Sequence, residues 1–174
     1  MTAILKRELK SAFSGMTGYA LCAALLVVGG LYFTVVNLLS GQTDFGYTLY
    51  NTCFALLIFI PILTMRSLAE ERHSKTDQLL LTAPVGIPSI ILGKFLAQLA
   101  VFPLPVAILG FCPLVMRLFG TVYLGKCYAA LLAYYLLGAA GIAIGIFLSG
   151  LTENQIIAAL CTFGVLLLAY LMPG

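Results

Sequence analysis

Long uncharged intervals constrain this chain more than any other feature of its sequence. Five intervals longer than 20 residues contain no Asp, Glu, Lys or Arg: residues 11–43, 45–65, 95–116, 127–152 and 154–174. A helix needs about 20 mostly apolar residues to cross a bilayer. The chain is 62% hydrophobic and 9% charged, whereas soluble domains carry about 25% charged residues. We therefore predict an all-α membrane protein. A transmembrane barrel would instead show short alternating segments.

The uncharged intervals divide one expected transmembrane domain, residues 1–174, into about five spans. Their expected bounds are 18–39, 47–65, 89–118, 127–149 and 156–172. The third interval contains Pro103, Pro105 and Pro113, so it cannot form one straight helix. Asn37 lies near the end of the first span, where we expect it to reach water and to have a structural role.

Residues 1–16 have the pattern of an interfacial amphipathic helix that lies on the membrane. Leu5 and Leu9 fall on one face at helical spacing, while Lys6 and Lys10 fall on the other. Basic groups beside an apolar face suit the anionic headgroups of membrane lipid. Membrane lipid is therefore an expected partner of this segment.

Residues 66–88 form a charged segment between the second and third spans. The stretch 65–94 holds seven of the fifteen charged side chains and the only histidine. Residues 67–81 lack glycine and proline, and Glu71 and Lys75 are four apart in the stabilising order. A short helix on the membrane surface is expected here. It could be a solvated, charged connection, or a rigid lever that a cytoplasmic partner holds.

The distribution of basic residues predicts the orientation of the chain. With the N-terminus in the cytoplasm, seven Lys and Arg residues face the cytoplasm and two face the outside. Basic residues favour the cytoplasmic side of a membrane. Residues 66–88 and the loop 150–155 are then cytoplasmic, and the C-terminus lies outside.

Small residues recur on one face of the fourth span. They are Gly138, Gly141, Gly145 and Ser149. Small residues at this spacing let two helix backbones approach closely in a membrane. The partner could be another helix of this chain or a second subunit.

Motifs for catalysis are missing from the sequence. It contains no HExxH and no GxxxxGK[ST], so it has no P-loop of its own for ATP. The five cysteines are scattered singly, without CxxC or a Cys/His cluster. We expect no enzymatic activity, cofactor or metal in this chain, and no nucleic-acid partner.

Two stretches resemble a known family. Residues Glu71–Val85, ERHSKTDQLLLTAPV, resemble the signature of ABC-2 type transporter permeases, in which an E-R pair, a threonine and an acid lead into L-L-x-x-P-V. Gly93-Lys94 matches the G-K at the start of the next span. Residues Leu151–Ala159 resemble the second cytoplasmic turn, especially in the gliding-motility-associated branch. Lys75 stands where the family usually has glycine, and the family fold has six spans against the five expected here.

The resemblance implies a membrane half-transporter and two sets of functional residues. It would dimerise with a second permease copy or paralogue and couple to ABC ATPase subunits on other chains, which hold the ATP. Residues 66–88 would be the main coupling helix, and the bacterial plasma (inner) membrane is the expected location. The expected ATPase contacts are Glu70, Glu71, Arg72, His73, Lys75 and Thr76. The second cytoplasmic loop would contribute Thr152, Glu153, Asn154 and Gln155.

Two functions follow from these patterns. The first is the permease subunit of an ATP-driven transporter, with export as the expected direction. The second is a non-transport membrane scaffold or assembly subunit that recruits a cytoplasmic partner without ATP-driven motion. Five expected spans instead of six favour the scaffold, and the two motifs favour the permease.

Overall fold

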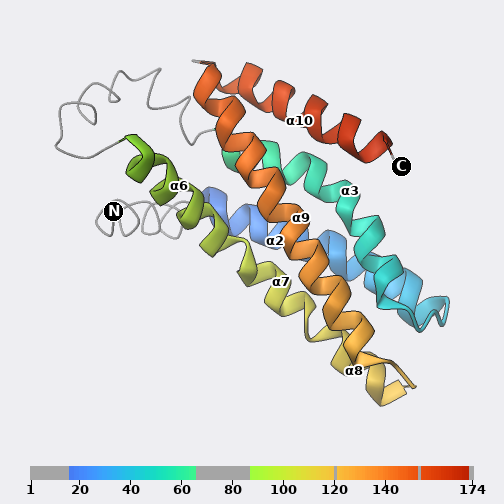
Figure 1. Cartoon of the computed structure of the whole chain (residues 1–174). Helices are drawn as coiled ribbons and strands as arrows, with labels where there is room; N and C mark the ends of the chain where they lie inside the picture. Colours follow the sequence, from blue (N-terminus) through green and yellow to red (C-terminus); the bar gives the residue numbers. More distant parts are fainter. Residues whose placement is uncertain (1–15, 66–86, 120, 153, 173–174) are drawn as a thin grey trace.

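The computed structural model describes residues 16–65, 87–119, 121–152 and 154–172 (Figure 1). These residues form helices joined by short turns, and no strand occurs among them. The helix bounds are α2 Met16–Tyr32, η1 Phe33–Leu39, α3 Phe45–Thr64, α6 Ile87–Val101, α7 Pro103–Leu109, α8 Cys112–Phe119, α9 Leu124–Leu151 and α10 Gln155–Leu171. η1 is a π-helix that directly continues α2. The predicted all-α fold is confirmed.

Four helical stretches have the length and apolar character needed to cross a membrane. They are Gly18–Leu39, Phe45–Thr64, Ile91–Leu118 and Leu124–Leu151. The apolar helix α10 has 17 residues, which gives a length of about 25 Å at 1.5 Å per residue. This length is at the lower limit for a span. The structure thus supports four to five membrane-spanning helices.

Prolines divide the third stretch into α6, α7 and α8. Pro103 is the first residue of α7, and Pro113 is the second residue of α8. A proline has no backbone N–H, so it fits the first turn of a helix, where no N–H donor is needed. The interruptions fall at Phe102 and at Gly110–Phe111. The expectation that this stretch is not one straight helix is confirmed.

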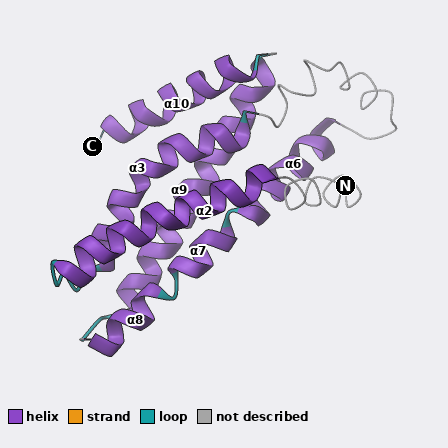
Figure 2. Ribbon diagram, turned by 180° about the vertical axis from the view of Figure 1, so that it is seen from behind, coloured by secondary structure: helices purple, strands orange, loops and turns teal. Residues whose placement is uncertain are grey.

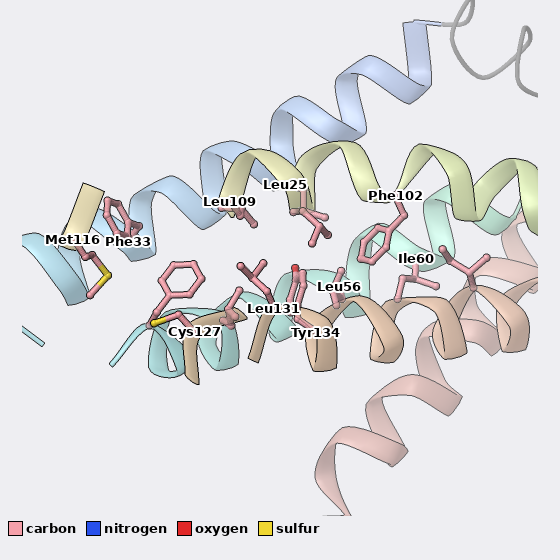
Figure 3. Close-up of a cluster of buried hydrophobic side chains, with 14 of the residues drawn as sticks. Leu25, Phe33, Leu56, Ile60, Phe102, Leu109, Met116, Cys127, Leu131 and Tyr134 are labelled. Carbon is pink, nitrogen blue, oxygen red and sulfur yellow. The ribbon is translucent and has the colours of Figure 1, made fainter. Parts of the chain in front are cut away.

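Helices α3 and α9 pack against each other at the centre of the bundle. Helix α2 packs on α3 and α7, while α10 packs on both α3 and α9 (Figures 1 and 2). Buried side chains from several helices fill the space between them, including Leu25, Leu56, Phe102 and Tyr134 (Figure 3). The ring of Phe102 stacks on Tyr134 and Tyr135, with centroid distances of 6.3 and 5.9 Å.

The outer surface of the bundle is strongly apolar. On α9 alone, Leu132, Leu136 and Phe147 are more than half exposed, at 63, 57 and 67%. Soluble monomers rarely expose large contiguous apolar patches. Such a surface is stable when lipid chains cover it, so the bundle is that of a multi-pass membrane protein.

The bundle has two ends, which we name after a residue at each. At the Met65 end, α2, α6 and α10 begin and α3 and α9 finish (Figures 1 and 2). At the Asp44 end, one short turn joins η1 to α3 and another joins α8 to α9. The expected interfacial helix 1–16 and coupling segment 66–88 lie almost wholly outside the described residues.

Candidate functional site

The small residues of α9 face the interior of the bundle. Gly138, Gly141, Gly145 and Ser149 are all buried. A Cβ atom at Gly138 would overlap the ring of Phe102, at the interruption between α6 and α7. A Cβ atom at Gly141 would lie 2.6 Å from Cδ1 of Ile60 on α3. Real Cβ contacts are not this short, so any larger residue at these positions would force Phe102 or Ile60 to move.

Helices α3 and α9 approach each other most closely where α3 ends. A Cβ atom at Gly145 would overlap Oγ1 of Thr64, which is fully buried, and would lie 2.8 Å from Cβ and Cγ2 of the same residue. Thr64 Oγ1 donates a hydrogen bond to the Ile60 carbonyl at 2.9 Å. One turn further along α9, Ser149 Oγ donates to the Met65 carbonyl at 3.3 Å. We call the four residues Thr64, Met65, Gly145 and Ser149 the α3–α9 junction.

Helix α6 is joined to α3 beside this junction. Gln98 Nε2 donates to the Leu63 carbonyl at 3.3 Å. The other side-chain atom, Gln98 Oε1, is buried and has no hydrogen-bond partner among the described residues. Lys94, one turn earlier on α6, is only 4% exposed. Lys94 therefore lies within a helix of the bundle and is covered by neighbouring helices.

The second predicted loop is short and well defined on both sides of Glu153. Thr152 Oγ1 donates to the carbonyl of Leu148, in the last turn of α9, at 3.5 Å. Asn154 Oδ1 accepts a hydrogen bond from Ile156 N at 3.0 Å, which caps the N-terminus of α10. Gln155 is the first residue of α10. Glu153 itself is outside the described residues.

The expected ATPase contacts also lie outside the described residues. These are Glu70, Glu71, Arg72, His73, Lys75 and Thr76. The structure describes the residues on either side of their segment. Met65 closes α3 and takes part in the α3–α9 junction, and Ile87 begins α6.

The Asp44 end contains a buried polar group. Asn37 is 7% exposed, so the expectation that it reaches water is wrong, although its role is structural. Its Nδ2 donates to the Gln42 carbonyl at 2.7 Å, and its Oδ1 accepts a hydrogen bond from Thr48 Oγ1. Gly41, with φ of 66°, lets the turn fold back over Asn37. These bonds fasten η1 to α3.

An ion pair lies on the surface of the same end. Lys126 Nζ is 3.7 Å from Asp44 Oδ2, and the side chains are 77% and 51% exposed. Asp44 Oδ1 also accepts from Gly46 N at 3.0 Å and so caps α3. Among the described residues, no group of three His, Cys, Asp or Glu side chains could hold a metal ion.

Some of these contacts had no signal strong enough for prediction. Gln98 is the single Gln, Asn, Asp or Glu between Lys94 and Arg117, so its polarity alone could have indicated an interhelical bond. The contact of Thr64 with α9 could not be predicted, because its hydroxyl bonds the Ile60 carbonyl of its own helix and nothing in the sequence marks it as an interhelical contact.

The long apolar helices, buried polar bonds and lipid-exposed surface together define a helical multi-pass membrane protein. A family model described as ABC-2 family transporter protein matches residues 31–173, and the chain belongs to this family. The resemblance in the sequence to ABC-2 permeases is thereby confirmed. The family is a component of membrane transport rather than an enzyme, and it generally works with ABC ATPase partners. No curated protein and no solved structure matches the chain.

Proposed function

We propose that this chain is a permease subunit that couples to a separate ATPase and exports its cargo. It would lie in the bacterial inner membrane with its N-terminus in the cytoplasm. The active unit would be two permease chains, either two copies or a copy and a paralogue, with two ABC ATPase subunits. Membership of the ABC-2 family supports the transporter, and the distribution of Lys and Arg supports the orientation. The loop at 151–159 supports the gliding-motility-associated branch.

The α3–α9 junction is the observation that carries this proposal. Met65 directly precedes the segment 66–86, and Ser149 lies one turn before Thr152. The two segments that we expect to meet the ATPase therefore leave from helix ends that are bonded to each other. A force on either segment would move α3 and α9 together instead of bending one loop.

The same force would reach the third stretch. Gln98 bonds α6 to the carbonyl of Leu63, one residue before the junction. Helix α6 ends at Val101, and Phe102 then packs against Gly138 of α9. A displacement at the Met65 end would thus be absorbed at the interruption between α6 and α7. ATP can shift the equilibrium between two conformations of the complex only if it binds one of them more tightly than the other.

A charge-removal experiment tests the coupling. The double variant Glu71→Ala/Arg72→Ala removes one acid and one base from the predicted coupling helix. The double variant Asp44→Asn/Lys126→Gln removes the same charges at the opposite end, retains a side-chain oxygen that can cap α3, and is the matched control. We expect the first variant to insert into the membrane and to uncouple ATP hydrolysis from transport. The control should keep both activities.

Two outcomes would contradict the proposal. If the ATPase co-purifies with the Glu71→Ala/Arg72→Ala variant and transport proceeds at the normal rate, residues 71 and 72 do not dock the ATPase. If the intact chain, purified in mild detergent and weighed as a complex, carries a partner that is not an ATPase, the scaffold function replaces the transporter. A complex mass that fits two permeases and two ATPases supports the proposal.

A further inference from the structure

A shallow cleft, open over most of its boundary, lies at the Asp44 end between the last turn of α8 and the start of α9. Its volume is about 670 Å³, and two basic residues, Arg117 and Lys126, line it. Residues 122–125 complete the described lining. Nothing in the ATPase coupling proposed above uses this cleft, which lies at the other end of the bundle from the α3–α9 junction.

The charge around the cleft is unbalanced. Arg117 is exposed in the last turn of α8, and no carboxylate pairs with it among the described residues. Lys126 has only the exposed, 3.7 Å pair with Asp44, and that carboxylate already caps α3 through Gly46 N. Two cations therefore lie near a single carboxylate, which pairs with Lys126 alone. Charge complementarity calls for an anionic ligand with several acceptor oxygens.

The start of α9 leaves room for such a ligand. The first turn of α9 has no acidic residue, and the side chain of Tyr123 makes no capping hydrogen bond. Nothing lies within 4 Å of the position that a Cβ atom would take at Gly125. A phosphate could approach this backbone closely, and the positive end of the helix dipole would add to the attraction of the two side chains.

The surroundings of the cleft indicate a lipid as the source of the phosphate. Leu118 and Tyr123 are 83% and 84% exposed, and Tyr128 is 44% exposed. Tyrosines gather at membrane–water interfaces, where the ring meets acyl chains and the hydroxyl meets headgroups. We propose that the cleft binds the phosphate headgroup of an anionic phospholipid between Arg117 and Lys126. A soluble phosphate would make no apolar contact with these exposed side chains, whereas the acyl chains of a lipid would.

Lipid binding to the full-length chain tests the proposal. The chain is purified in mild detergent and titrated with short-chain phosphatidylglycerol or phosphatidylcholine, and native mass spectrometry measures the bound lipid. We expect phosphatidylglycerol to bind at least fivefold more tightly. One basic residue near a membrane surface changes binding by roughly fivefold and two by roughly 25-fold. Arg117→Gln/Lys126→Gln should therefore abolish the preference.

Two single variants sharpen the test at the same cleft. Asp44→Asn removes the competing carboxylate and should strengthen phosphatidylglycerol binding severalfold. Arg117→Lys keeps the charge and should keep most of the preference. Equal binding of the two lipids to the unmodified chain would overturn the proposal, and so would an unchanged preference in Arg117→Gln/Lys126→Gln. Displacement of the lipid by about 10 mM inorganic phosphate, a concentration at which screening by salt is weak, would overturn the lipid as the ligand.

Discussion

The two ends of the bundle are held together in different ways. At the Asp44 end, buried side chains bond across a short turn, as Asn37 does with Gln42 and Thr48. At the Met65 end, glycine lets α3 and α9 touch, and one serine hydroxyl reaches a backbone carbonyl. The first arrangement depends on the polarity of particular side chains. The second depends on side chains being absent, and it holds together helices that are far apart in the sequence.

The difference separates two kinds of mechanical role. A polar group bonded across a turn fixes that turn in one geometry, because each alternative leaves a buried donor or acceptor unpaired. Helices α3 and α9, in contact through glycine and joined by the Ser149–Met65 bond, can move as one body while that bond is kept. We therefore expect the Asp44 end to be the fixed end and the Met65 end to be the one that moves as a unit.

Adding a methyl group at the α3–α9 junction should have the largest effect on stability. Gly145→Ala places a Cβ atom 2.8 Å from Cβ of Thr64, and this atom is attached to the backbone and cannot turn away. We expect a loss of about 1–3 kcal/mol, the usual cost of overpacking a filled core. The temperature at which helicity is lost in mild detergent, followed by circular dichroism, measures it.

A matched glycine gives the control for this variant. Nothing lies within 4 Å of a Cβ atom at Gly164 on α10, so Gly164→Ala should be neutral or slightly stabilising. Thr64→Ala removes the hydroxyl and methyl that Gly145→Ala meets, and it should restore part of the lost stability. Equal effects of the two glycine variants would show that the close contact at Gly145 is not what holds this end.

Removing the buried amide at the Asp44 end should have an intermediate effect. Asn37→Leu leaves the hydroxyl of Thr48 and the carbonyl of Gln42 without their partner. Hydrogen bonds between membrane helices contribute on average about 0.6 kcal/mol and at most about 1.7 kcal/mol. We expect a loss of about 1–2 kcal/mol in detergent, and a coupling of about 1 kcal/mol in a double-mutant cycle with Thr48→Val.

Thr34→Val provides the comparison for the Asn37 variant. Its hydroxyl is exposed and bonds only the Gly30 carbonyl of its own helix at 2.8 Å. That variant should cost little, since it breaks no contact between helices. If it cost as much as Asn37→Leu, polarity within η1 would matter and the bond to Thr48 would not.

The surface ion pair at the Asp44 end should have the smallest effect. Lys126→Gln breaks a 3.7 Å pair between side chains that are 77% and 51% exposed. Exposed pairs contribute at most about 1 kcal/mol and many contribute nothing. We expect a change below about 0.5 kcal/mol in lipid-free detergent, measured at low and high salt. A larger loss would mean that the charged surface, and not the buried amide, fixes this end.

Much of the fold could be predicted because membrane helices have a strong signal in composition. The uncharged intervals located the helices, and the prolines located the interruptions in the third stretch. Helix ends were less predictable, since α9 runs from Leu124 to Leu151 where 127–149 was expected. Its ends are set by the turns on either side, which the apolar composition does not indicate.

Some features of the site could be predicted from the sequence and others could not, for a physical reason. A row of small residues on one face indicated close packing but not its partner, and the structure places it against α3 and Phe102. The burial of Asn37 depends on a turn that folds back over it, and the burial of Lys94 depends on neighbouring helices. Such tertiary effects are not visible in the residues next to them in the chain. The expected ATPase contacts at 70–76 remain predictions.

The π-helix η1 affects which changes of chain length the protein can tolerate. Ser40 N bonds the Val35 carbonyl five residues back at 3.1 Å, so this turn holds one residue more than an α-helical turn would. Deleting one residue between Phe33 and Val36 would let the segment become α-helical. An α-helical turn with one residue fewer completes about the same rotation, so Asn37 would still face Thr48. Within these few positions we expect a single deletion to be tolerated, whereas a deletion inside an α-helical stretch such as α3 would turn every later residue by about 100°.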